Sequence, residues 1–314
     1  MSLMTSRTDG EIVPRIPVGE GIETVFDWVD DNLGGFFQAV RDLVLGATDG
    51  LADLLNSPAP LVLVALLSLL AWLVKDWKFA VVSFVGLAFI ISVDQWENAM
   101  TTLALVLIAT FIALVIAIPL GIAAAKSAAV SNAIRPVMDL MQTMPAFVWL
   151  VPVVTLFSIG PAGGVVATVI FALPPGVRLT ELGIRQVDSE VVEAGHAFGS
   201  TPGHILRGIQ IPLALPTIMA GVNQVIMLAL SMAVIAGLVG AGGLGGAVTS
   251  SIAQLDIGLG FEAGLSVVVL AIFLDRVTAA VGDGRSDRDR RVLGALGRLF
   301  GRPENKPVPL ATKS

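Results

Sequence analysis

Long apolar segments alternate with short polar ones along most of the chain. Seven of them are apolar enough to be predicted as membrane-spanning: 59–74, 79–93, 99–125, 134–158, 162–184, 213–239 and 261–281. The first two are shorter than the about 20 residues that usually cross a bilayer. We expect these two to form a tight transmembrane hairpin. The pattern therefore predicts an all-α integral membrane protein with about seven transmembrane helices.

The region before the first span has a different pattern. Over residues 22–55 apolar side chains recur at helical spacing, and acidic side chains lie mostly between them. This predicts an amphipathic helix that lies on the bilayer surface or packs against the bundle, with docking of a partner as the alternative. Its acidic face argues against attraction to anionic lipid, which favours lysine and arginine.

Composition supports a membrane protein. Hydrophobic residues make up 55% of the chain and charged residues only 14%, whereas soluble domains carry about a quarter charged residues. There is no cysteine, which excludes disulfides, thiolate metal sites and a cysteine nucleophile.

The distribution of lysine and arginine predicts the orientation. The connections at 94–98, 159–163 and 240–260 contain neither residue, whereas the alternate connections and the C-terminal end do. Basic residues concentrate on the cytoplasmic side of membrane proteins. We therefore expect a plasma (inner) membrane protein with its N-terminus outside and its C-terminus in the cytoplasm.

A polar stretch, residues 193–212, lies between two of the apolar segments. It begins within a segment predicted as helix, because residues 189–194, 196 and 197 contain no helix breaker, and Gly199 is placed to end that helix in the left-handed conformation. Thr201 followed by Pro202 predicts the N-cap and first turn of a second short helix. Two short helices held at the membrane surface could transmit force from a soluble partner into the bundle.

The same stretch resembles the signature loop E-A-A-x3-G-x9-I-x-L-P of permease subunits in binding-protein-dependent importers of the ATP-binding-cassette (ABC) class. The residues that fall in this frame are Glu193, Ala194, Gly195, Gly199, Ile209, Ile211 and Pro212. Gly195 and Ile211 depart from the signature, each by a change to a similar residue. The resemblance implies that these residues couple the permease to a separate ATPase.

Further blocks resemble the permease subunit of glycine betaine/proline betaine importers, over about residues 60–282. They are Gln142–Phe147, Ile170–Pro175, Pro216–Gln224, Leu228–Met232, Gly240–Gly245 and Leu274–Arg276. Methionine importers share something similar to the glycine-rich block. The resemblance implies an importer permease that forms the path for a quaternary-amine osmoprotectant, with another small solute such as choline or methionine as the alternative.

The resemblance also implies an organisation and a set of partners. The expected regions are an extracytoplasmic tail 1–57, a transmembrane hairpin 58–94, a type I ABC permease core 97–282 with a cytoplasmic coupling loop 185–212, and a basic cytoplasmic tail 283–314. The expected partners are an ABC ATPase subunit, an extracytoplasmic solute-binding protein, a second permease copy in a homodimer, and the lipid bilayer, with no nucleic acid. We expect a transporter subunit, not an enzyme, without a catalytic residue, metal or cofactor of its own, because ATP and magnesium would bind to the ATPase.

Uncharged polar residues within the spans, with one methionine placed between them, are candidates for the translocation path. They are Gln142, Asn223, Gln224, Met227 and Ser231. Asn223, Met227 and Ser231, at i, i+4 and i+8, could share a helix face that lines a path for a net-neutral solute. Hydrogen bonding between packed helices is an equally good explanation of such residues. Asp275 and Arg276 are expected to be a structural pair or an interface anchor.

Two other functions are less well supported by the sequence. The segment Gly240–Gly245 matches the dinucleotide fingerprint G-x-G-x-x-G, but it ends an apolar span and does not follow a strand in a soluble unit. An ion-coupled secondary transporter would normally carry ionisable residues within its spans or inverted repeats, and neither is clear in this sequence.

Overall fold

The computed structural model describes the backbone of residues 18–299 and the side chains of residues 19–282. Every described element is helical: α1 (Val18–Asn56), α2 (Pro60–Val74), α3 (Trp77–Ser92), α4 (Trp96–Lys126), α5 (Ala128–Thr143), α6 (Ala146–Phe157), α7 (Pro161–Arg185), α8 (Ser189–Ala197), α9 (Pro202–Ile205), the π-helical turn η1 (Leu206–Gln210), α10 (Ile211–Ala236), the 3-10 turn η2 (Gly237–Val239), α11 (Gly243–Gln254) and α12 (Ile257–Leu299). The first part of the predicted N-terminal tail, 1–17, and the end of the predicted basic tail, 300–314, lie outside the described residues.

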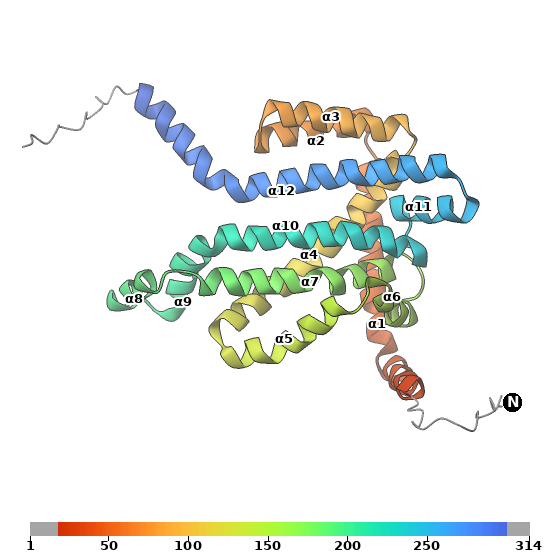
Figure 1. Cartoon of the computed structure of the whole chain (residues 1–314), viewed down its shortest axis with the longest axis horizontal. Helices are drawn as coiled ribbons and strands as arrows, with labels where there is room; N and C mark the ends of the chain where they lie inside the picture. Colours follow the sequence, from red (N-terminus) through yellow and green to blue (C-terminus); the bar gives the residue numbers. More distant parts are fainter. Residues whose placement is uncertain (1–17, 300–314) are drawn as a thin grey trace, which may run out of the picture.

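The core consists of the long helices α4, α7, α10 and α12: α7, α10 and α12 run side by side, and α4 crosses obliquely behind α7 and α10 (Figure 1). Helix α7 is central, because it packs against both α4 and α10. Small buried side chains such as Ala113, Ala117, Ala172 and Ala229 allow these helices to approach closely. Close packing of small residues is how helices associate where the surrounding lipid is as apolar as the helices themselves.

Four helical segments are long and apolar enough to cross a membrane: Trp96–Lys126, Pro161–Arg185, Pro202–Val239 and Ile257–Gly282. Two bent pairs, α1 with α2 and α5 with α6, raise the number of candidate spans to as many as six. Helix α3, with 16 residues, is a shorter apolar helix. Together these elements cover the seven apolar segments predicted from the sequence.

The segment 134–158, predicted as one span, is divided between α5 and α6, which meet at a bend of 103°. Pro145 explains the break, because a proline pushes the residue before it out of the helical region. Met144 accordingly has an extended backbone, with φ −72° and ψ 134°.

Helix α1 confirms the predicted amphipathic helix and continues without a break through Gly34 and Gly35. It meets α2 at 100° and runs across the long helices near one of their ends (Figure 1). It packs against α4, α6 and α7, and the ring of Phe37 meets that of Phe157 edge to face at 5.3 Å. The helix is therefore attached to the bundle along part of its length.

The predicted loop 240–260 and the predicted basic tail from residue 283 both contain more helix than expected. The segment 240–260 includes α11 and the start of α12. Helix α12 continues past the predicted end of the last span to Leu299, so the predicted tail from residue 283 begins as helix. Helices α8 and α9 lie at one end of the bundle, and α6 and α11 lie toward the other (Figure 1).

Candidate functional site

The predicted coupling loop, residues 185–212 (hereafter the coupling loop), contains helix α8, which ends as the sequence predicts. Gly199 has φ +77°, in the left-handed region. Its N–H donates to the carbonyl of His196 at 2.9 Å, and the N–H of Ser200 donates to the carbonyl of Gly195 at 3.1 Å. This pair of hydrogen bonds is the Schellman motif, which satisfies the last carbonyls of a helix and reverses the chain.

The second half of the coupling loop also follows the prediction. The side chain of Thr201 accepts from the N–H of His204 at 3.4 Å, and Pro202 occupies the first turn of α9. The π-helical turn η1 then joins α9 to α10 without a break. The segment Pro202–Val239 is therefore continuous, so that α9 is the end of a helical segment long and apolar enough to cross a membrane.

Helix α8 packs against α9 and η1 through small and branched side chains. Gly195 is buried, and a Cβ on it would lie 3.0 Å from Cδ1 of Ile209 and 3.3 Å from Cγ1 of Ile205. Glycine is thus the residue that lets α8 lie closest to α9 and the π-helical turn η1. A cluster of Ile184, Leu206, Ala214 and Ile218 fixes the base of the loop to the ends of α7 and α10.

The other residues of the signature frame face outward or lie at the base of the loop. Glu193, Ala194, Gly199 and Pro212 are exposed, and Ile209 and Ile211 are half-buried. The structure also reveals a residue that the sequence analysis missed: Phe198, which precedes the turn and is 89% exposed. A large aromatic side chain at the tip of a polar loop is typical of an anchor that fills a pocket in a partner.

The candidate path residues come from two helices. Gln142 is exposed near the end of α5, which packs against α4 and α7, whereas the other four residues lie on α10. Gln224 and Ser231 are exposed, and Met227 is half-buried. Within residues 19–282 no hydrogen bond joins Gln142 to these α10 residues.

Asn223 is half-buried and contacts α12. Its amide nitrogen donates to Oδ1 of Asp275 on α12 at 2.9 Å, and its amide oxygen is buried without a partner. With about 100° per residue, Asn223 lies about 80° from Ser231 around the helix axis. Asp275 also faces Arg276 at 3.8 Å. The contact is therefore of the helix-packing kind, which was one of the two explanations left open.

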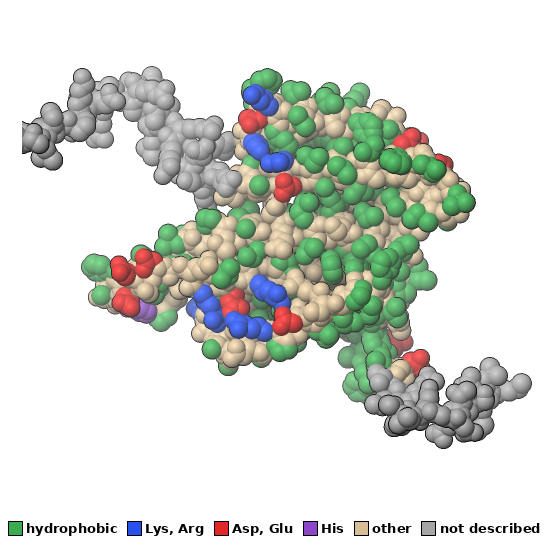
Figure 2. Space-filling view, in the orientation of Figure 1, with side chains coloured by type: hydrophobic (Ala, Val, Ile, Leu, Met, Phe, Trp, Pro, Cys, Tyr) green, Lys and Arg blue, Asp and Glu red, His purple; other side chains and the backbone are tan. Residues whose placement is uncertain are grey.

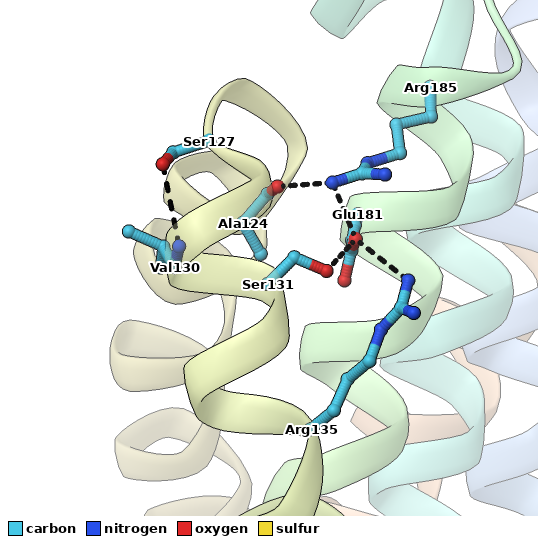
Figure 3. A network of polar contacts seen from close by, with 7 residues as sticks. All are labelled: Ala124, Ser127, Val130, Ser131, Arg135, Glu181 and Arg185. Carbon is cyan, nitrogen blue, oxygen red and sulfur yellow. Dashed lines mark hydrogen bonds and ion pairs between the residues drawn. The ribbon is translucent and has the colours of Figure 1, made fainter.

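A carboxylate network that the sequence analysis did not identify joins α4, α5 and α7 (Figure 3). Oε1 of Glu181 accepts from the hydroxyl of Ser131 at 2.7 Å and faces the guanidinium groups of Arg185 at 3.0 Å and Arg135 at 3.7 Å. Arg185 also donates to the carbonyl of Ala124 at 2.8 Å. Arg185 follows Glu181 by four residues, but Ser131 lies 50 residues away and Ala124 lies 61 residues from Arg185, so no local pattern could have indicated the contacts between helices.

A second ion pair, Arg178 with Asp139, joins α5 and α7. Its side chains are 46% and 64% exposed, compared with 11% for Glu181. Figure 2 shows basic side chains with acidic ones among them near the α8–α9 end, while hydrophobic side chains cover much of the other visible surface. A second group of basic side chains lies near α2 and α3, and acidic side chains also lie at the opposite end of the bundle, so that only the basic charges of this view are gathered toward the α8–α9 end, as expected for one membrane face.

Comparison with known proteins identifies relatives that match most of this chain. The glycine betaine/proline betaine transport system permease protein ProW of Escherichia coli (strain K12) is 48% identical over 290 residues, covering 90% of this chain and 81% of ProW. The glycine betaine transport system permease protein OpuAB of Bacillus subtilis (strain 168) is 44% identical, covering 85% of this chain and 94% of OpuAB. The glycine betaine/carnitine transport permease protein GbuB of Listeria monocytogenes (serotype 1/2a, strain 10403S) is 46% identical, covering 85% and 96%.

The fold also matches a solved structure, an inward-facing conformation of the MetNI methionine ABC transporter. The TM-score is 0.52 at 24% sequence identity, over 64% of this chain and 95% of the matched one. At that identity the likeness concerns the fold alone. Residues 117–286, which include the coupling loop, match the family described as binding-protein-dependent transport system inner membrane component. The helical bundle, the signature loop and the relatives lead to one conclusion: this chain is a membrane permease subunit that belongs to the family of inner-membrane components of binding-protein-dependent transport systems.

Proposed function

We propose that this chain forms the translocation path of an ATP-driven importer for glycine betaine, proline betaine or a related compact quaternary amine. The observation that carries the proposal is the identity of 44–48% to three permeases whose names include glycine betaine, each covering at least 85% of this chain. The path offers amides, a hydroxyl and a thioether at Gln142, Gln224, Ser231 and Met227. Such groups suit a solute without net charge.

The coupling loop is proposed to dock on a separate ABC ATPase, which binds ATP and magnesium. Glu193 offers a charge and Phe198 an apolar anchor, and both side chains are exposed. The turn at Gly199 holds α8 and α9 so that both can contact one groove. The permease itself is proposed to bind no cofactor and to catalyse no reaction.

A solute-binding protein and a second copy of this chain complete the proposed importer. The exposed side of α10 carries Leu213, Pro216, Ala220, Gln224 and Ser231, which recur at helical spacing. A second copy facing this stripe would enclose a path between two equivalent helices, as in closed two-fold dimers. No role for nucleic acid is proposed.

The N-terminus is proposed to lie outside and the C-terminal end in the cytoplasm. The argument is the absence of lysine and arginine from 94–98, 159–163 and 240–260. A single cysteine in this cysteine-free chain tests it. Ala162 is only 2% exposed, so Ile159, at 73%, is the better site. Cysteine at Ile159 should react with an impermeant thiol reagent from outside and cysteine at Phe198 from inside, and the opposite pattern would refute this orientation.

Uptake into proteoliposomes tests the solute. The permease is reconstituted with its ATPase and binding protein, and uptake of labelled glycine betaine, proline betaine, choline and methionine is measured with ATP. We expect betaine uptake that stops with a hydrolysis-deficient ATPase. Methionine uptake without betaine uptake would contradict the solute class. Uptake driven by an ion gradient without the ATPase would instead indicate a secondary transporter.

A further inference from the structure

Among the residues whose side chains are described, Glu181 carries the one buried carboxylate. It lies one turn before the end of α7, and α7 leads through residues 186–188 into α8 of the coupling loop. Its Oε1 receives the hydroxyl of Ser131, in the first turn of α5, at 2.7 Å. A single oxygen atom thus connects α7, which leads into the coupling loop, with α5, which follows α4.

Arg185 extends the same contact to α4. Its guanidinium lies 3.0 Å from Glu181 and donates to the carbonyl of Ala124 at 2.8 Å, in the last turn of α4 (Figure 3). The last four carbonyls of a helix have no partner within the helix, and a cation there is favourable. The corner between α4 and α5, residues 124–131, is therefore attached to α7 at two points.

The energetics favour a positional role for this carboxylate. A buried charge requires several good partners, and an apolar side chain of similar size often stabilises such a site as well or better. The neighbouring pair of Asp139 and Arg178 joins the same two helices at the surface, where ion pairs contribute little. What Glu181 adds, beyond packing, is one defined arrangement of α4, α5 and α7.

We propose that Glu181 is a positioning residue for energy coupling, and that its contacts make the α4–α5 corner move together with α7 when the coupling loop is displaced. The proposal rests on the function proposed above. Helix α5 carries Gln142 toward its other end, so movement of the corner repositions one side of the candidate path. Without the contacts of Glu181, the coupling loop still contacts the ATPase, but displacement of the loop no longer moves α5.

The first test measures solute taken up per ATP hydrolysed by the complete reconstituted importer. Glu181→Gln retains a group that can pair with Ser131 but removes the charge that holds both arginines. We expect stimulated hydrolysis close to that of the wild type and a fall in uptake per ATP of about fivefold or more. Asp139→Asn, in the exposed pair between the same helices, should leave the ratio unchanged. A wild-type ratio in Glu181→Gln would overturn the proposal.

The second test separates positioning from stability. In the double variant Ser131→Cys/Glu181→Cys the two thiols are the only ones in the chain, because the sequence contains no cysteine. We expect weak coupling before treatment, recovery of uptake per ATP after linkage by a short bifunctional thiol reagent, and loss again on reduction. Linkage that fails to restore uptake would overturn the proposal. Failure of the wild-type importer itself to transport betaine would instead refute the proposed function.

Discussion

The turns at the two ends of the helical segment Pro202–Val239 both contain glycine, but the glycines meet different physical requirements. In the coupling loop Gly199 has φ +77°, and a Cβ placed on it would meet no atom within 4 Å. In the turn at the other end, a Cβ on Gly237 would lie 2.1 Å from the carbonyl carbon of Gly245. Gly199 is needed for its left-handed backbone conformation, whereas Gly237 is needed because it lets two backbone segments approach closely.

The difference indicates what each turn contacts. The turn at Gly237 packs into its own chain, and the N–H of Leu244 donates to the hydroxyl of Thr102 on α4 at 2.8 Å. The tip of the coupling loop, including Phe198, points away from the rest of the chain and is exposed. Substitutions at the Gly237 turn should therefore affect folding, while substitutions at the tip of the coupling loop should affect transport.

The largest effect on stability is expected for Gly237→Ala. The added methyl group would collide with backbone that cannot move aside as a flexible side chain does, at a cost of ~3 kcal/mol or more. Thermal unfolding in detergent measures the loss. Gly246→Ala is the matched control, because a Cβ there meets nothing within 4 Å and alanine favours helix. Similar unfolding temperatures for the two variants would contradict the packing argument.

A smaller loss of stability is expected for Thr102→Val. The hydroxyl of Thr102 accepts from Leu244 and donates to the carbonyl of Asn98 at 2.9 Å. Valine has a similar shape but leaves the N–H of Leu244 without a partner, which costs about 1–3 kcal/mol. Thr101→Val removes only a contact with the carbonyl of Glu97 in the same helix. If both variants unfold at the same temperature, the hydrogen bond between the Gly237 turn and α4 does not contribute measurably to stability.

At Gly199 the expected effect is on transport. A valine at φ +77° costs about 1–2 kcal/mol and should reshape the turn, while the spans remain folded. We expect Gly199→Val to insert normally and to lose ATP-driven uptake. Gly199→Asn should retain much of it, because asparagine tolerates the left-handed region. Uptake and stimulated hydrolysis in proteoliposomes measure both variants, and full activity of Gly199→Val would show that the turn is not required.

The smallest effect on stability is expected for Glu193→Lys, because this exposed side chain makes no ion pair among the described residues. Reversing its charge should weaken docking of the ATPase. Co-purification of the ATPase with the permease measures docking. Glu97→Lys, the same reversal in the first turn of α4 near the Gly237 turn, is the control. Equal losses in the two variants would indicate a general effect of charge.

Local signals explain what the sequence predicted well. The caps formed by Gly199 and Thr201 act within a few residues of the chain, and apolar periodicity is a property of single segments. The same reasoning missed α11, since glycine lowers helix propensity and tertiary packing overrides it here. Ser131 and Asp275, the hydrogen-bond partners of Glu181 and Asn223, lie about 50 residues away from them in the sequence. Such pairs follow from how the helices pack, which composition and spacing do not reveal.

The continuity of residues 202–239 has a consequence for leakage. At 1.5 Å per residue this segment of 38 residues is about 57 Å long, and it joins the coupling loop directly to the turn at Gly237. The π-helical turn η1, Pro216 and the 3-10 turn η2 are places where this segment can bend, whereas the helix between them is regular. We expect backflow of an accumulated solute to require displacement of both ends of the segment. The stiffness of its regular middle part would then contribute to how steep a gradient such an importer can maintain.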